Sequence, residues 1–306
     1  MRSSESIAVA STRSRRSTTL ITAAIVLLAI ALIIAVPTAT NWWQVVILGV
    51  VEGLTEFLPI SSTGHLLIAS DLLGFEGSLG GTFEIFIQLG AVIAVVGFYA
   101  PELLRQARSV PHDPQVRRFW IAVGIAFVPA AAIGLVLHSW IKAVLFSPPV
   151  IGVALIAGGL VLIAVERLPQ RAPAVHNVLH VSLRQAIGIG IAQVLALVPG
   201  VSRSGASIVG GMLAGLDRRA ATAFSFYLAI PTLGAATIVD LLTSLDQLTP
   251  GDMGRLFLGL VVSLVVAWLS IGWLLRYVAN HSFVAFGLYR IIAGVVILAL
   301  VAAGRL

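Results

Sequence analysis

Cysteine is absent from this chain of 306 residues, and charged side chains make up only 10% of it. The first absence excludes disulfides, thiol nucleophiles and thiolate metal sites. The second excludes an ordinary soluble domain, in which about a quarter of the residues are charged because the surface faces water. Hydrophobic residues reach 58%, and the mean hydropathy is +1.03. The composition therefore predicts an integral membrane protein.

Long apolar stretches indicate how the chain crosses the bilayer. A membrane-spanning helix needs roughly 18 or more apolar residues, and helices are expected because lipid cannot satisfy open backbone groups. The strand alternation of a membrane barrel is absent. We therefore expect an all-α membrane fold. Its spans are predicted near 19–37, 83–100, 118–138, 148–165, 220–243, 254–275 and 283–303.

The net charge of +6 does not indicate a nucleic-acid partner, because the basic residues lie between apolar spans and form no single basic face. Basic loops are typical of the cytoplasmic side of a membrane protein. With this orientation, segments 42–75 and 185–215 must each enter and leave on one face, so both are predicted to be re-entrant. The basic clusters are Arg13, Arg15 and Arg16; Arg105, Arg108, Arg117 and Arg118; Arg167, Arg171 and Arg184; and Arg218 and Arg219.

These two segments also resemble each other. The topology inverts one relative to the other, and inverted repeats with broken helices place a binding site near the bilayer midplane. We expect six core transmembrane helices and two re-entrant pairs in a membrane domain at 42–306, with repeats at about 42–165 and 184–303. A basic cytoplasmic segment, 1–18, precedes an extra transmembrane helix (or signal anchor) at 19–37. We expect this helix to be retained, and a cleaved signal peptide is the alternative. A shift of 141 residues aligns Gln44 with Gln185, Gly49 with Gly190, Leu54 with Leu195, Ser61 with Ser202, Gly64 with Gly205, Gly74 with Gly215 and Phe83 with Phe224.

The first segment carries two carboxylates, Glu52 and Glu56, at a spacing that puts both on one helix face. A charge in mid-membrane costs about 2.5–3.5 kcal/mol on insertion scales, and adjacent like charges call for a cation between them. Carboxylate oxygens with substrate phosphates suit Mg²⁺ or Ca²⁺. Two alternatives stay open: the carboxylates could reach the membrane interface, or pair with an arginine.

Polar residues follow where Pro59 must stop the helix. Their hydroxyls could cap a new helix starting near His65, but free amides at a helix start also bind anions. His65 could then serve as a general acid or base. The cluster consists of Ser61, Ser62, Thr63 and Gly64.

The second segment repeats the break at Pro199 and adds Arg203 within an apolar region. The guanidinium fits phosphate bidentately, although a salt bridge to Glu52 or Glu56 is the alternative. Hydroxyls, carboxylates, a histidine and an arginine are the parts that phosphoryl transfer needs. Two rival functions are a transporter or flippase of a phosphorylated lipid and a non-catalytic scaffold. The glutamate pair and His65 argue against the first, and the buried charges argue against the second. The other polar or small residues of the second segment are Ser202, Ser204 and Gly205.

The stretches 52–65 and 199–205 resemble the two signatures of the bacitracin-resistance type of undecaprenyl-diphosphate phosphatases. The likeness runs from about Trp42 to the C-terminus and includes Gln88 to Ala91. It implies a bacterial inner-membrane enzyme, with its site open to the outer face. This enzyme hydrolyses undecaprenyl diphosphate to the monophosphate carrier of cell-wall synthesis and confers bacitracin resistance.

The resemblance also implies residue roles. Glu52 and Glu56 would bind a divalent cation, Ser62 or a metal-bound water would attack phosphorus, and His65 would transfer the proton. The diphosphate would be held by Arg203 and by a cradle of Ser61, Thr63, Gly64, Ser202, Ser204 and Gly205.

Two weaker patterns complete the sequence. Tyr289 and Arg290 are typical of an anchor at the membrane surface. Gly211 and Gly215 are typical of close helix packing, within one chain or in a homodimer.

Overall fold

The computed structural model describes residues 42–75, 82–168, 175–244 and 253–306. Within these ranges the regular structure is helical, apart from one isolated bridge between Val175 and Leu216. The predicted segments 1–18 and 19–37 lie outside the described residues. The helices are α2 (Trp42–Thr55), α3 (Ser62–Leu72), α4 (Thr82–Phe98), α5 (Ala100–Ser109), α6 (Pro114–Val144), α7 (Pro148–Arg167), η1 (Val178–His180), α8 (Leu183–Val194), η2 (Leu195–Leu197), α9 (Arg203–Leu213), α10 (Arg218–Ser244), α11 (Met253–Tyr277) and α12 (Val284–Ala302).

Five of the described helices are long and apolar enough to cross a membrane, and a sixth span results if α4 and α5 are counted as one bent pair. Because these helices coincide with predicted spans, the all-α membrane class is confirmed. The chain is a multi-pass membrane protein. The five helices are α6, α7, α10, α11 and α12.

The helix α5 is a difference from the prediction, which placed a loop after residue 100. It bends away from α4 by 64°. Pro101 lies in its first turn, where a residue without an N–H is tolerated but where a preceding helix cannot continue unchanged. Gln106 is buried on one face of α5, whereas Arg105 and Arg108 are exposed on the other. An amphipathic helix therefore replaces the expected loop.

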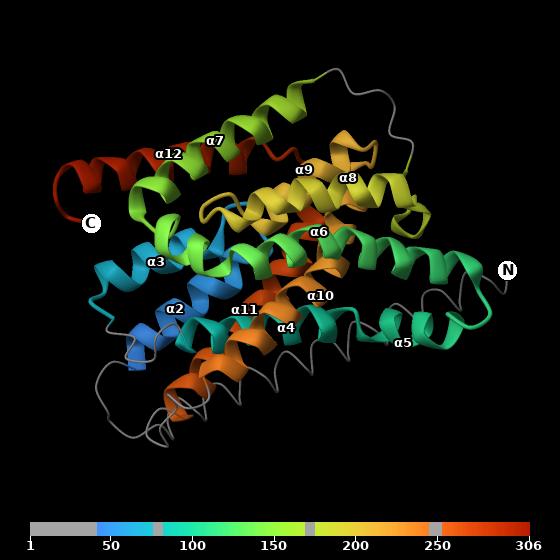
Figure 1. The fold of residues 1–306 in the computed structure, drawn as a ribbon, viewed down its shortest axis with the longest axis horizontal. Coiled ribbons are helices and arrows are strands. Elements are labelled where there is room, and N and C mark those ends of the chain that lie inside the picture. The colour runs from blue at the N-terminus through green and yellow to red at the C-terminus, as the bar shows by residue number, and fades with distance from the viewer. Residues whose placement is uncertain (1–41, 76–81, 169–174, 245–252) are drawn as a thin grey trace, which may run out of the picture.

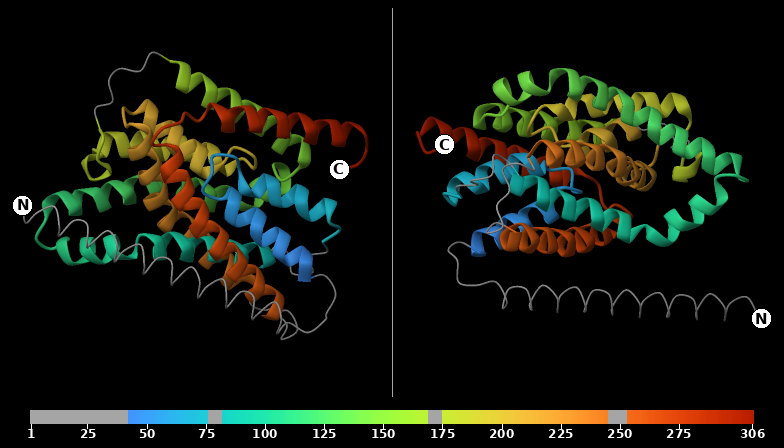
Figure 2. Two further views of the ribbon diagram at one scale, coloured as in Figure 1. Left: turned by 180° about the vertical axis from the view of Figure 1, so that it is seen from behind. Right: turned by 60° about the horizontal axis from the view of Figure 1, so that its bottom comes forward.

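Two helical hairpins, α2–α3 and α8–α9, form the centre of the molecule. Each consists of two short helices that meet at a break, and the two hairpins open towards opposite ends of the molecule, so that their breaks approach each other in the middle (Figures 1 and 2). The breaks span residues 56–61 and 195–202. This arrangement brings two stretches that are far apart in sequence into one region.

Equivalent hydrogen bonds close the open ends of both hairpins. In the first, Gln44 Nε2 donates to the carbonyl oxygen of Leu73 at 2.7 Å. In the second, Gln185 Nε2 donates to the carbonyl oxygen of Ala214 at 2.9 Å. Both members of the second pair follow those of the first by the 141 residues of the sequence alignment. The two hairpins thus share a specific tertiary contact, and their second helices, α3 and α9, are both 11 residues long.

Each hairpin packs on a long helix of the other half of the chain. Helices α2 and α4 pack against α11, α8 and α10 pack against α6, and α7 runs along α12. Glycines at equivalent positions permit the close approach: a Cβ on Gly49 would lie 3.0 Å from the carbonyl oxygen of Gly259, and one on Gly190 would lie 2.7 Å from that of Ala126. A Cβ on Gly211 would meet Ala221 at 3.0 Å, so Gly211 packs within the chain.

A buried aromatic group lies beside the first break. Phe57, directly after Glu56, is fully buried and meets Phe226 of α10 edge to face, with ring centroids 5.3 Å apart. Phe119 and Phe224 extend this core. Large aromatic side chains that bury most of their surface fix the backbone that carries them. The core therefore holds the residue next to Glu56 in a defined position.

Candidate functional site

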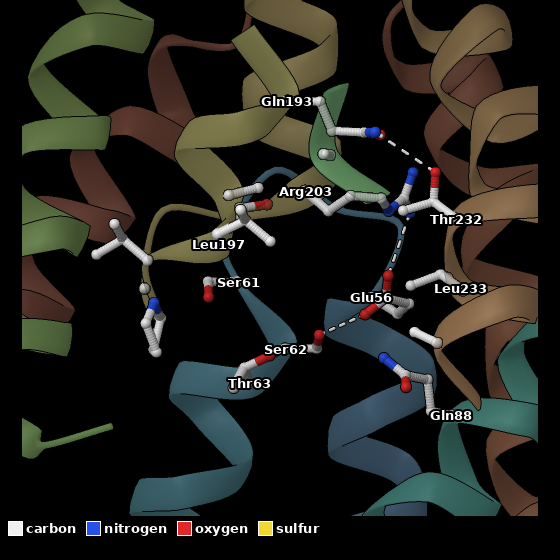
Figure 3. Close-up of a pocket in the computed structure, with 17 residues that line it drawn as sticks. Glu56, Ser61, Ser62, Thr63, Gln88, Gln193, Leu197, Arg203, Thr232 and Leu233 are labelled. Carbon is white, nitrogen blue, oxygen red and sulfur yellow. Dashed lines mark hydrogen bonds and ion pairs between the residues drawn. The ribbon is translucent and has the colours of Figure 1, made fainter. Parts of the chain in front are cut away.

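A cavity of about 180 Å³ lies where the two breaks meet. Its walls come from both hairpins, from α4, from α6 and from the middle of α10, where Pro231 interrupts the helix ladder. Figure 3 shows Ser62 and Arg203 on either side of Glu56, each joined to it by a dashed line. A polar cavity of this kind within an apolar bundle is the default binding site of a membrane protein. The polar residues that line it are Glu56, Ser61, Ser62, Thr63, Gln88, Gln193, Ser202, Arg203 and Thr232.

Glu56 connects the two hairpins chemically. Its Oε1 pairs with Arg203 Nη2 at 3.2 Å, across 147 positions of sequence, and both side chains are more than nine-tenths buried. Its Oε2 accepts the hydroxyl hydrogen of Ser62 (Figure 3). The predicted convergence of the two loops is therefore present, and the salt bridge weighed as an alternative for Arg203 exists in this state.

Arg203 is held in place by groups on α10 and by a ring. Its Nη1 donates to the carbonyl oxygen of Ser225 at 2.9 Å and lies 3.3 Å from the Ser225 hydroxyl, while Cζ lies 5.9 Å from the centre of the Phe57 ring. Its Nε is buried without a hydrogen-bond partner among the described residues. A buried donor without a partner is unfavourable, and the Nε–H of Arg203 is therefore a donor that a bound anion could accept from.

The serine before each second helix has an unusual backbone. Ser61 has φ +73° and Ser202 has φ +77°, and they are the two described non-glycine residues with positive φ. Such conformations are strained and gather at functional sites. Helices α3 and α9 begin directly after them, so α3 starts at Ser62 and not near His65 as predicted. Ser202 Oγ caps the Gly205 amide at 3.1 Å, whereas Ser61 makes no such cap.

Several predicted residues lie beside the cavity without lining it. Glu52 is 1% exposed, and its Oε1 has no hydrogen-bond partner among the described residues. Ser204 Oγ donates to the Leu58 carbonyl oxygen at 2.7 Å, which ties the second hairpin to the first. A Cβ on Gly64 or on Gly205 would approach a neighbour to 3.0 Å, so both glycines serve close packing.

His65 also lies outside the cavity lining. Its Nδ1 is 2.7 Å from the carbonyl oxygen of Ser61, and its Nε2 is 2.6 Å from the hydroxyl of Tyr289 on α12. The two rings are stacked, with centroids 5.6 Å apart and planes 10° from parallel. Both ring nitrogens are therefore engaged away from the Glu56–Ser62 pair.

Arg290 is a residue whose role the sequence reading missed. It is 1% exposed, so the expectation of a surface anchor is wrong for this side chain. Its guanidinium donates to carbonyl oxygens of both breaks, at 3.1 Å to Pro59 and 2.9 Å to Gly200. Two further bonds reach Ala154 and Leu155 on α7. An arginine inside an apolar span, as at Arg203, was the available signal, but only the fold reveals its acceptors.

Three further amide or hydroxyl side chains line the cavity, and two of them, Gln193 and Thr232, were not predicted as site residues. Gln88 on α4 points towards the Glu56 side (Figure 3). Gln193 is 1% exposed, and its Nε2 lies 3.4 Å from Thr232 Oγ1. Its Oε1 has no partner among the described residues. Gln193 occupies the position in α8 that Glu52 occupies in α2.

The carboxylates near the cavity suit a cation whose remaining ligands come from the substrate and from water. Among the described residues no group of three or more acidic, histidine or cysteine side chains converges. Glu56 faces the cavity, however, and Glu52 lies one helical turn away with a buried, unpaired oxygen. Mg²⁺ is commonly held by one or two carboxylates, with phosphate oxygens and water as the other ligands. The residues present fit such an ion.

The fold and the cavity define a class: a multi-pass membrane protein with a buried polar cavity, lined by one arginine, one carboxylate, two amides and several hydroxyls, at the start of two helices. The family model described as "Bacitracin resistance protein BacA" matches residues 45–296. The chain belongs to this family.

Curated relatives agree with that assignment. An undecaprenyl-diphosphatase of Albidiferax ferrireducens is 50% identical over 256 residues, which cover 83% of this chain and 92% of the relative. Proteins of the same name in Cereibacter sphaeroides and Polaromonas naphthalenivorans are 49% and 48% identical, over 84% and 83% of this chain and 96% and 92% of their own length.

Proposed function

We propose that this protein is an undecaprenyl-diphosphate phosphatase. It hydrolyses undecaprenyl diphosphate to undecaprenyl phosphate and inorganic phosphate, which recycles the lipid carrier of cell-wall synthesis and gives bacitracin resistance. The names of its relatives support this substrate. One observation carries the chemistry: Arg203 of one hairpin and Ser62 of the other both bind Glu56 at the same cavity.

The Glu56 hub supports a two-stage mechanism. A diphosphate entering the cavity competes with Glu56 for the Arg203 guanidinium, because both are oxyanions that fit its fork. Once released from Arg203, Glu56 is a stronger proton acceptor for the Ser62 hydroxyl it already binds. Ser62 Oγ attacks the terminal phosphorus, its proton passes to Glu56, and the bond from phosphorus to the bridging oxygen breaks. Water then hydrolyses the phosphoserine.

Donors around the cavity stabilise the charge that develops on the phosphate oxygens. Arg203 supplies a cation, and the starts of α3 and α9 supply backbone amides. We propose that a divalent cation, Mg²⁺ or Ca²⁺, is held by Glu56 and Glu52. When bound, it would neutralise negative charge on the diphosphate. Oxygen-18 from labelled water, followed in single turnovers, separates a phosphoserine route from direct attack by water.

The arrangement of the hairpins supports an inverted-topology repeat in the bacterial cytoplasmic membrane. Both hairpins would be re-entrant, with α2–α3 open to the outer face and α8–α9 open to the cytoplasm, and the cavity would be reached from outside. The basic ends of α5, α7 and α8 lie towards one end of the molecule, and the open end of α2–α3 lies towards the other (Figure 1). Since the chain has no cysteine, single cysteines at Leu72 and Arg184 test this orientation directly. An impermeant thiol reagent should label only the first in intact cells.

The deciding assay measures phosphate released from undecaprenyl diphosphate by purified protein in detergent. We expect release with Mg²⁺ or Ca²⁺, loss of release with a chelator, and recovery when the cation is restored. Ser62→Ala should release no phosphate while eluting as a folded protein. If the wild type releases none with either cation, but moves the lipid across a vesicle bilayer, the transport alternative is correct.

A further inference from the structure

The neutral ring of His65 has a single arrangement of protons compatible with its two contacts. A carbonyl oxygen only accepts, so Nδ1 must carry the hydrogen that is donated to Ser61. Nε2 is then the acceptor, and the Tyr289 hydroxyl donates to it. The partner of one ring nitrogen thus sets the tautomer of the other. Tyr289 holds the ring by this bond and by stacking on it.

The acceptor of His65 belongs to the strained turn. The Ser61 carbonyl and the Ser62 amide form one peptide unit, and Ser61 has φ +73°. The orientation of this peptide determines where Ser62 leaves the turn and hence whether its hydroxyl meets Glu56. His65 donates to this carbonyl at 2.7 Å, and its own backbone amide donates to the same oxygen at 3.3 Å. The histidine therefore restrains the peptide that carries Ser62.

The second hairpin shows how the same turn is restrained without a histidine. Its strained serine, Ser202, caps Gly205 with its own hydroxyl and bonds Ser204 Oγ at 3.0 Å. The position equivalent to His65 is there Ala206. In the first hairpin the Ser61 hydroxyl makes no cap and lines the cavity. Ser202 therefore both lines the cavity and braces its own turn, whereas the turn at Ser61 has no hydroxyl cap and is restrained by the bond from His65 to the Ser61 carbonyl oxygen.

We propose that His65 and Tyr289 form a positioning pair that acts through the Ser61–Ser62 peptide, and that His65 transfers no proton at the reacting phosphate. This inference rests on the proposed function for its activity readout. Tyr289 becomes a positioning residue for the reaction. Tyr289 is 44% exposed, and its hydroxyl fixes the rotamer and tautomer of His65.

Amide substitutions separate positioning from proton transfer, because they mimic one ring nitrogen each and do not transfer protons. In His65→Asn the amide nitrogen replaces Nδ1 and can still donate to Ser61. In His65→Gln it replaces Nε2, and in His65→Ala both contacts are lost. We expect His65→Asn to keep kcat within about fivefold of wild type with an unchanged pH profile. His65→Ala and His65→Gln should lose about 30-fold or more in kcat, with KM changed much less.

Tyr289→Phe keeps the stacked ring and removes the hydroxyl. We expect a loss of about threefold in kcat with His65 present, and no further loss in the His65→Asn background, where Nε2 is gone. A second stacked pair provides the control: the rings of Tyr277 and His281 are 4.6 Å apart, and His281 Nδ1 is 3.2 Å from the Tyr277 carbonyl oxygen. Tyr277→Phe and His281→Asn should leave turnover unchanged.

Two results would overturn the proposal. One is a folded His65→Asn that is as inactive as His65→Ala, or that loses one limb of the pH profile. The other result does not depend on turnover and comes from nitrogen-15 spectra of histidine-labelled protein. The His65 signal is identified as the one that is absent from His65→Asn. We expect this signal to report a hydrogen on Nδ1 and to shift in Tyr289→Phe. A hydrogen on Nε2 would contradict the pairing. A wild type that releases no phosphate would overturn the proposed function, while the spectra would still decide this inference.

Discussion

The hairpin α2–α3 supplies a carboxylate and three hydroxyls to the cavity, whereas α8–α9 supplies an arginine, an amide and one hydroxyl. Their backbones nevertheless match closely. Both hold a glutamine bond across the open end, both reach a positive-φ serine at the break, and both lay a glycine against a helix of the other half. The positions that shape the turn are thus kept in both copies, while the charged side chains that face the cavity differ.

The difference follows from electrostatics. With the 141-residue shift, Ser62 corresponds to Arg203, Glu52 to Gln193 and His65 to Ala206. Two identical copies would bring two arginines, or two pairs of glutamates, together in one buried cavity, and unpaired like charges in such surroundings are strongly unfavourable. The first hairpin instead carries a nucleophile, Ser62, and its base, Glu56, and the second carries a cation, Arg203. The charges of Glu56 and Arg203 then neutralise each other, and the site is complete. The asymmetry of the side chains is therefore a condition for placing the site between the repeats.

The largest effect should come from removing the cation of the second hairpin. Arg203→Ala should reduce kcat/KM for undecaprenyl diphosphate by about 10³-fold or more, because it removes the phosphate ligand and leaves Glu56 unpaired. Arg203→Lys should recover only part of this loss, since an ammonium lacks the planar fork. Phosphate release measures both. The exposed Arg219 offers the control, and equal losses in Arg219→Ala would show that general charge near the membrane is responsible.

Changing the acid of the first hairpin should have the next largest effect. Glu56→Gln keeps a group that can bond Ser62 but cannot take its proton, so we expect kcat to fall by about 10²-fold to 10³-fold. Substrate affinity should fall less, or rise, because Arg203 is then free of its carboxylate partner. Steady-state kinetics test this. The control is Glu102→Gln on α5, because Glu102 pairs with Arg105 and lies outside the cavity lining. Undiminished turnover in Glu56→Gln would remove Glu56 from the mechanism.

Much of this comparison was visible in the sequence. Span length and the cost of burying charge are local properties, so the spans and the pairing of Arg203 with Glu56 could be predicted. The direction of His65 could not. We predicted that the helix starts near His65, whereas α3 begins at Ser62. Each helical residue turns by about 100° around the helix axis, so three additional helical residues change the direction in which the side chains of this turn point. Arg290 could not be assigned either, because its acceptors come from α7 and both breaks.

Smaller effects should follow from adding a Cβ at glycines where the helices pack too closely to accept one. A Cβ at Gly190 would meet a backbone oxygen of α6 at 2.7 Å, and one at Gly49 would meet a backbone oxygen of α11 at 3.0 Å. Overpacking of this kind costs about 1–3 kcal/mol. We expect both alanine variants to lower the midpoint of thermal unfolding, Gly190→Ala by more. Gly188→Ala on the same helix has open space and should raise the midpoint or leave it unchanged. A fall in Gly188→Ala equal to that in Gly190→Ala would contradict this packing argument.

The smallest predicted effects concern the two glutamines that close the hairpins. Gln44→Ala and Gln185→Ala each remove one hydrogen bond to a carbonyl, which is worth about 1 kcal/mol. Gln185 does more than its counterpart, because its Oε1 also accepts the Ser182 amide at 2.9 Å in a capping box at the start of α8. Gln44 Oε1 has no partner among the described residues. Gln185→Ala should therefore lower the thermal midpoint about twice as far as Gln44→Ala. Equal shifts would show that the cap contributes nothing, and a larger shift for Gln44→Ala would mean that the two closures are not equivalent.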